Sequence, residues 1–312
     1  MKAGLYLLGF TLLLALGCSR PPRASGEDYY VIRKGRLYGY IDHLGNVAIG
    51  PQFSFALPFR EGLAGVNVGG NASGDRIPTD GKWGVINTNG QYVFNPVFIS
   101  PPNGGQLTSR EEIGRTLHHA FQFSEHLAPV YTEKGWRYMD TLAREMGQSF
   151  RLQSARRFSE GLAAVMIDGY WGYVQRAGDA VVLAIAPDYL YPVEFHNGFA
   201  LVKNRQGDEI VIDREGNRRF AQYRIITQFR NGAAVIRSRF RGERESASDT
   251  YKYAMIDTAG RRWFTPQFDE IRSFGSDLIP VRVGSTPRGN DDTFFESYVG
   301  GKWGFVNVNG RF

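Results

Sequence analysis

The chain has 312 residues, of which 42% are hydrophobic and 14% aromatic, so there is ample apolar material for a core and global disorder is excluded. The formal charge is +6, and acidic residues lie among the basic ones without a block of one sign, so we expect no nucleic-acid partner. The 38 glycines, together with many aromatic residues, favour short strands joined by tight turns over helices.

The amino terminus has the pattern of a targeting signal. Lys2 precedes an apolar run from Ala3 to Leu16, which has the length of a signal-peptide core and is too short to span a bilayer comfortably. Gly17 then precedes Cys18, the single cysteine of the chain. This pattern resembles the lipobox of bacterial lipoproteins, in which the cysteine is acylated and becomes the first residue. The resemblance implies a signal peptide over residues 1–17 and a lipid anchor in the cell envelope at Cys18.

The segment after the cysteine is expected to be a flexible tether. Residues 18–28 are rich in Pro, Arg, Ser and Gly, and Ser19 resembles the residue that directs such lipoproteins to the outer membrane. The remaining residues, 29–312, then form one domain. A single cysteine excludes an internal disulfide, so the core alone must stabilise this domain.

The domain contains two interleaved sequence motifs. In the first, an aromatic residue is followed by Asp or Asn four positions on and by Gly seven positions on, and seven copies occur, with Glu209 as a main exception to the aromatic position. The aromatic residues and their glycines are Tyr38, Gly39, Trp83, Gly84, Trp136, Trp171, Gly172, Tyr253, Trp303 and Gly304. The second motif reads Phe-x-Glu-Gly-Leu-Ala-x-Val, as at Phe59 to Val66 and Phe158 to Val165. Two motifs in a fixed order indicate a repeat protein.

These motifs resemble the WG repeat family over roughly residues 30–312, and the resemblance implies a β-rich repeat module without a shared enzymatic activity. Strands such as Trp83 to Asn87 have no polar face, so neighbouring units must cover both sides. The glycine beside each tryptophan leaves a hollow that a neighbouring unit's indole could fill. Units of about 40 residues have the size of a propeller blade. We therefore expect an all-β fold of antiparallel meanders in a toroidal ring of about seven units, with an open curved β-solenoid as the alternative.

The acidic residues of the repeat are interpreted as turn residues. In Asp42 to Gly45 the carboxylate can cap a turn and the glycine can supply a positive φ. Glu61, Glu125 and Glu160 recur at one place in the second motif, which favours a structural role over acid catalysis. Each turn offers a single carboxylate, so we expect no metal site.

Insertions in the repeat are the candidate binding loops. Three of them, at Gly69 to Asp80, Ser238 to Thr250 and Gly284 to Gly300, occupy the same connection and should lie on one edge. The last contains Asp291, Asp292, Phe294, Phe295 and Tyr298. The alternative is that these loops have merely lengthened at little cost. A fourth insertion, Ile99 to Ala120, is expected to contain a short helix over Arg110 to Leu117.

The function expected from the sequence is binding. Catalytic motifs with known mechanics are absent, so we expect no enzyme and no cofactor, and regular spacing favours core packing over cofactor stacking for the tryptophans. The partner would be a protein or an envelope glycan, and the chain a monomer attached to the membrane through its anchor. The alternative is a cell-wall hydrolase, which needs two carboxylates about 5 to 10 Å apart in a cleft.

Overall fold

The structure of the chain is a computed structural model. The residues that it describes are 28–71, 77–100, 119–240, 250–272, 278–288 and 297–312. They form β-strands and no α-helix, which confirms the predicted all-β fold. The signal peptide, Cys18, nearly all of the tether and the predicted helix Arg110–Leu117 lie outside these residues. In this part of the chain, no helix has the length and apolar character needed to cross a membrane.

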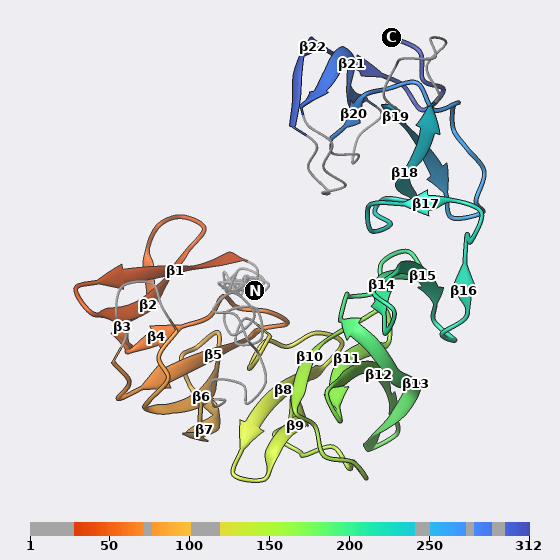
Figure 1. Ribbon diagram of the computed structural model, residues 1–312. Helices are drawn as coiled ribbons and strands as arrows, with labels where there is room; N and C mark the ends of the chain where they lie inside the picture. Colours follow the sequence, from red (N-terminus) through yellow and green to blue (C-terminus); the bar gives the residue numbers. More distant parts are fainter. Residues whose placement is uncertain (1–27, 72–76, 101–118, 241–249, 273–277, 289–296) are drawn as a thin grey trace, which may run out of the picture.

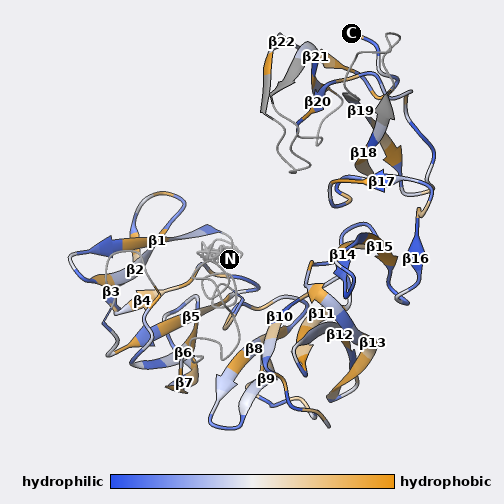
Figure 2. Ribbon diagram, in the orientation of Figure 1, coloured by the Kyte–Doolittle hydropathy of each residue, from blue (hydrophilic) through white to orange (hydrophobic). Residues whose placement is uncertain are grey.

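Within the described residues the strands form seven consecutive antiparallel meanders, named units 1 to 7 in chain order (Figure 1). Units 1 to 3 contain β1 (Tyr29–Lys34), β2 (Leu37–Asp42) and β3 (Val47–Phe53), then β4 (Phe55–Ala56), β5 (Leu63–Val68), β6 (Lys82–Asn87) and β7 (Tyr92–Phe98), then β8 (Leu127–Thr132) and β9 (Gly135–Asp140). In Figure 2 hydrophobic residues fall mainly in the strands and hydrophilic residues in the turns.

Units 4 and 5 share one sheet, because the long strand β13 passes from one unit into the next. This sheet contains β10 (Ser154–Ser159), β11 (Leu162–Ile167), β12 (Tyr170–Ala177), β13 (Ala180–Tyr191), β14 (Phe199–Asn204), β15 (Glu209–Asp213) and β16 (Arg218–Arg219). Unit 6 contains β17 (Arg224–Ile225), β18 (Ala233–Phe240) and β19 (Thr250–Asp257), and unit 7 contains β20 (Glu270–Ile271), β21 (Ile279–Arg288) and β22 (Ser297–Val306).

In units 1, 2 and 4 the glycine beside the motif aromatic residue is required by the third strand of its own unit, whereas a Cβ on Gly304 of unit 7 would meet the ring of Phe312. The pairing of β6 with β7 shifts register on both sides of Val85, and a Cβ on Gly84 would lie 2.8 Å from the carbonyl oxygen of Phe94. The corresponding distances are 2.4 Å at Gly39 and 2.6 Å at Gly172. The hollow is therefore filled by a bulged backbone and not by a neighbouring indole, which corrects the sequence-based expectation.

The aromatic side chains pack between consecutive units. The Trp83 indole of unit 2 stacks on Phe121, which precedes β8 of unit 3, with ring centroids 5.1 Å apart and planes 6° apart. In unit 1 the Tyr40 hydroxyl donates a hydrogen bond of 2.8 Å to the carbonyl of Leu57, and its ring contacts Phe59 of unit 2 at 4.6 Å. At these two junctions the following unit buries aromatic rings of the unit before it, as the repeat predicted.

The recurring glutamates join one unit to the next through backbone amides. The Glu61 carboxylate accepts hydrogen bonds from the amides of Glu125 at 2.7 Å and His126 at 2.9 Å. The Glu160 carboxylate accepts equivalent bonds from Asn197 at 2.6 Å and Gly198 at 2.7 Å. Both donating turns have positive φ at two consecutive residues, which points their amides outward toward the preceding unit. The structural role predicted for these residues is confirmed.

The repeat array is an open arc, with unit 1 and unit 7 at its two ends (Figure 1). The open curved form, our alternative, is therefore the one observed, and the closed ring is not. The N-terminal segment does not complete unit 7, because β1, β2 and β3 form a sheet of their own. Phe312 instead packs in unit 7, with its ring 6.3 Å from that of Phe268.

Trp303 of unit 7 differs from the other motif tryptophans. Trp83, Trp136 and Trp171 are 2 to 3% exposed, whereas Trp303 is 45% exposed. No unit follows β22 in the described residues, so the indole is flanked only by guanidinium groups, those of Arg272 at 4.8 Å and Arg282 at 5.5 Å. The expectation that every motif tryptophan is a core residue fails at this end of the array.

Candidate functional site

The predicted binding loop lies almost wholly outside the described residues. This holds for Asp291, Asp292, Phe294 and Phe295, while Tyr298 lies in β22 with its backbone opposite Pro287 of β21. Ser238 to Thr250 and Ile99 to Ala120 also fall largely in segments that the structure does not describe. Gly69 to Asp80 is described except for residues 72–76, and there the Asp80 carboxylate accepts hydrogen bonds from the amide and the side chain of Asn71, both at 2.8 Å. A candidate site must therefore be built from other residues.

The described residues form a cleft of about 540 Å³ between units 5 and 6. Its walls come from the end of β13, from β14 and β15, and from the segment after β17. The lining residues are Tyr191, Val193, Leu201, Val202, Lys203, Glu209, Ile226, Thr227 and Gln228. Most are apolar, and Lys203 lies directly opposite Glu209 across β14 and β15, so the rim has one charge of each sign.

The cleft lies where a motif aromatic residue of the repeat is missing. Glu209 stands four residues before Asp213, as Trp83 stands four residues before Asn87. Ile226 donates its backbone N–H to the Val235 carbonyl at 3.0 Å, as Phe121, the ring stacked on Trp83, donates to the Pro129 carbonyl at 2.8 Å, so Ile226 occupies the register of Phe121. Glu209 and Ile226 thus replace an indole and a phenyl ring that fill the junction of units 2 and 3. Both replacements are smaller, and the volume that they do not fill is open as the cleft.

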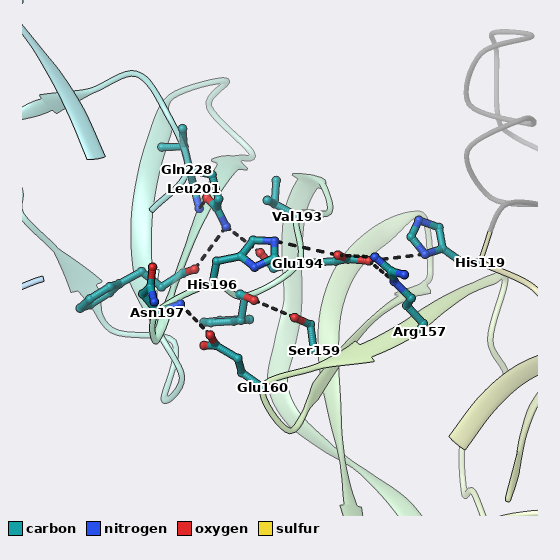
Figure 3. Close-up of polar contacts among 12 residues, drawn as sticks. His119, Arg157, Ser159, Glu160, Val193, Glu194, His196, Asn197, Leu201 and Gln228 are labelled. Carbon is teal, nitrogen blue, oxygen red and sulfur yellow. Dashed lines mark hydrogen bonds and ion pairs between the residues drawn. The ribbon is translucent and has the colours of Figure 1, made fainter. Parts of the chain in front are cut away.

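Gln228 holds the inner end of this cleft. Its side-chain carbonyl accepts a hydrogen bond from the Leu201 amide at 2.7 Å, and its side-chain NH₂ donates to the carbonyls of Glu194 at 2.6 Å and Phe199 at 3.2 Å (Figure 3). One amide group therefore satisfies three backbone groups that a neighbouring strand would otherwise pair. A side chain of unit 6 thereby fixes the edge of β14 in unit 5.

Gln228 belongs to a polar row, Arg157, Glu194 and Gln228, which are the residues before the motif phenylalanines of units 4, 5 and 6 (Figure 3). The Arg157 guanidinium donates to both carboxylate oxygens of Glu194, at 2.8 and 3.1 Å. His119 and His196 flank the same carboxylate at 3.5 and 4.0 Å. The row therefore links the unit 3 segment that carries His119 to units 4, 5 and 6.

The Glu194 carboxylate is held in its ionised form. Burial is the largest single influence and by itself would raise the pKa of Glu194. The hydrogen bonds and charge of Arg157, with the charges of His119 and His196, outweigh burial, so the pKa lies below its usual range. A carboxylate bound in this way to a guanidinium is a structural ion pair, because both of its oxygens already have donors.

The chemistry that the cleft can offer is limited. Of the described residues that line it, Glu209 alone has a carboxylate, so they do not supply the paired acids that glycoside hydrolysis needs. Among the described residues, no group of three or more His, Cys, Asp or Glu side chains could hold a metal ion. What the lining does provide is apolar surface, one cation, one carboxylate and neutral hydrogen-bonding groups.

The fold and the cleft define an all-β repeat module with a recess at one junction. The family model for the WG containing repeat matches residues 38–71, 83–98, 136–171 and 253–286. The chain therefore carries WG repeats, as its motifs predicted. β15, which contributes Glu209 to the cleft, lies outside the matched segments, in agreement with its departure from the motif. No curated protein matches the chain.

Proposed function

We propose that the chain is a non-catalytic binding module of the cell envelope, anchored through Cys18, which holds its ligand in the cleft between units 5 and 6. The observation that carries this proposal is the cleft itself. Its volume of about 540 Å³ falls within the range of about 300 to 1,000 Å³ that ligand pockets occupy. Its largely apolar lining with a few polar groups is the composition that such pockets have.

The cleft walls are fixed before any ligand arrives. Gln228 ties β14 to unit 6, and the Arg157–Glu194 ion pair ties units 4 and 5. A pre-formed site loses less conformational entropy on binding than one that must order its walls. The side chains of Gln228, Arg157 and Glu194 are occupied by these contacts, which favours a role in support over one in chemistry.

The first experiment tests the cleft. Photoreactive benzoylphenylalanine in place of Tyr191, which is 50% exposed at the cleft, should give a crosslinked adduct when cells are irradiated. The matched control places the same group at Val182, which is 37% exposed on the same strand and does not line the cleft. Adducts at neither position, or equal adducts at both, would show that the cleft is not the binding site.

The second experiment tests the anchor. The wild-type chain should incorporate a labelled fatty acid and sediment with membranes, whereas Cys18→Ser should do neither, since the thiol is the acceptor in the lipobox pattern. Ser19→Ala, next to the cysteine, is the control and should keep the label. A Cys18→Ser variant that still takes up the label would contradict the anchor and leave the cleft proposal standing.

A further inference from the structure

We infer that the ligand of the cleft between units 5 and 6 is a peptide that inserts an aromatic side chain in the place of the missing motif ring. This inference rests on the proposed function and names the ligand class of the same site. It follows from a comparison of the junctions within this chain, because equivalent positions in the repeat have equivalent surroundings.

At two other junctions between units, an aromatic ring occupies the place that corresponds to the cleft. At the junction of units 2 and 3 it holds the Trp83 indole, which is 2% exposed and stacked on Phe121. At the junction of units 1 and 2 it holds the ring of Tyr38, 5.0 Å from the ring of Phe55. The space between neighbouring units at this register is therefore shaped by flat rings.

The walls of the cleft offer a hydrogen-bond acceptor and apolar surface. The Trp83 ring needs an acceptor for its N–H, which Ser100 provides with its hydroxyl oxygen at 2.9 Å. In the cleft, the Glu209 carboxylate is an acceptor that an entering indole N–H or phenol O–H can use. Val193, Leu201 and Ile226 supply apolar surface for the ring faces. An aromatic ring with one donor can use this acceptor as well as the apolar surface, whereas an aliphatic chain can use the apolar surface alone.

The rim of the cleft favours a ligand in which the ring is the side chain of a peptide. Lys203 and Glu209 face each other across β14 and β15, so the rim carries no net charge and does not select a strongly charged ligand. Alternating polar groups of both kinds, Thr227 and Gln228 among them, suit the neutral donors and acceptors of a peptide backbone. The cleft is also larger than one ring requires, which leaves room for the residues beside it.

The experiment compares two blocked tripeptides that differ only at the centre, acetyl-Gly-Trp-Gly-amide and acetyl-Gly-Leu-Gly-amide, by isothermal titration calorimetry. We expect the tryptophan peptide to bind about tenfold more tightly, since ring contacts and the N–H bond together reach the roughly 1.4 kcal/mol that a tenfold change requires. Free indole should bind more weakly than the tryptophan peptide, because it lacks the backbone groups.

Variants of the cleft walls provide the controls. Glu209→Trp restores the indole of the repeat and should abolish binding of both peptides, while Glu209→Gln keeps the space and should reduce the tryptophan preference without closing the cleft. If Glu209→Trp does not fold, Ile226→Phe fills the cleft from the opposite wall. Circular dichroism and thermal melting of each variant check the fold.

The possible results separate the two proposals. Equal binding of the leucine and tryptophan peptides would overturn the aromatic ligand and leave the cleft as a binding site. Free indole that binds as tightly as the tryptophan peptide would overturn the peptide and retain the ring. Binding that survives both filling variants, or no binding of either peptide to the wild-type chain, would overturn the inference, and crosslinking at Tyr191 would then decide whether the cleft binds anything else.

Discussion

The glycine that follows a motif aromatic residue shows how single positions are constrained in this repeat. At Gly84 the backbone of β7 occupies the space that a side chain would need, with the Phe94 carbonyl oxygen 2.8 Å from the place of a Cβ. At Gly50, in β3, a Cβ would have open space around it, and the backbone has no positive φ. Both glycines lie within strands of neighbouring units, but Gly84 is buried against a bulged backbone and Gly50 is exposed.

Gly84→Ala should lower the free energy of unfolding by about 2 kcal/mol, because either the β6–β7 pairing or the bulge must shift to admit the methyl group. Gly50→Ala should change it by less than about 0.5 kcal/mol. Chemical denaturation followed by circular dichroism measures both. Equal losses in the two variants would mean that the close approach of the backbone is not what selects glycine.

The Arg157–Glu194 ion pair predicts a pH dependence. The pKa of Glu194 is lowered in the folded chain, so the pair contributes stability above the ordinary carboxyl pKa near 4.3 and loses it as the pH falls through the lowered value. Glu194→Gln should therefore destabilise the chain by about 1 to 2 kcal/mol at pH 7, and the difference from wild type should shrink below about pH 4.

The control for this prediction is Asp188→Asn, which removes an ion pair with Arg205 between side chains that are 60% and 47% exposed. Exposed pairs contribute less than about 1 kcal/mol, so this variant should change stability little at any pH. Denaturation midpoints between pH 3 and pH 7 test both variants. A Glu194→Gln difference that is constant with pH would argue against an ion pair.

Among the turns, the carboxylate contacts decide how one unit is joined to the next. Glu160 is the clearest case, because each of its two oxygens accepts one amide of the Asn197–Gly198 turn. Such turns occur in strongly twisted hairpins, where positive φ exposes two consecutive amides. The contact therefore uses backbone groups that any sequence with this turn would present.

Glu160→Ala should cost about 1 to 2 kcal/mol and should speed hydrogen exchange at the Asn197 and Gly198 amides. Glu133→Ala, at an exposed residue in the β8–β9 turn, should alter neither. Exchange measured by NMR or mass spectrometry reports the effect directly. Unchanged protection of the two amides in Glu160→Ala would show that the carboxylate does not hold the turn.

Features of the strands and turns that depend on one motif could be predicted from the sequence, and those that join two units could not. The strands, their order and the Asp-x-x-Gly turns were predictable, because each depends on residues within one motif; Asp42 accepts the amides of Leu44 and Asn46 at 2.9 and 2.8 Å as its turn required. The cleft could not be predicted, because its lining residues Glu209 and Ile226 come from two different units. The irregular residue at Glu209 was the one available signal. The Arg157–Glu194 pair joins two units and leaves no local pattern.

For the molecule as a whole, the open arc makes its two ends unlike its middle. Trp83 is covered by the next unit, whereas Trp303 and Phe305 in β22 are 45% and 61% exposed. Equivalent residues thus have different energetic roles because of their place in the array. The sequence could not show this, because the motif around Trp303 is as regular as that around Trp83.

Trp83→Ala should therefore cost about 4 kcal/mol, the usual result of removing a buried aromatic ring, and Trp303→Ala about 1 kcal/mol. Acrylamide should quench the fluorescence of Trp303 far more than that of the buried tryptophans, and Trp303→Phe should remove most of the quenched signal. Similar losses of stability in the two alanine variants would imply that the end of the arc is covered in solution.

The open arc also determines how a local event spreads. Units 1 and 7 lie at opposite ends, so closure of a ring does not fix the angle between one unit and the next (Figure 1). Curvature in a repeat array is the sum of small rotations at successive junctions. A ligand bound between units 5 and 6 would set the rotation at that one junction. Units 6 and 7 would move with it as a rigid arm, so that binding in a small recess would displace the far end of the arc.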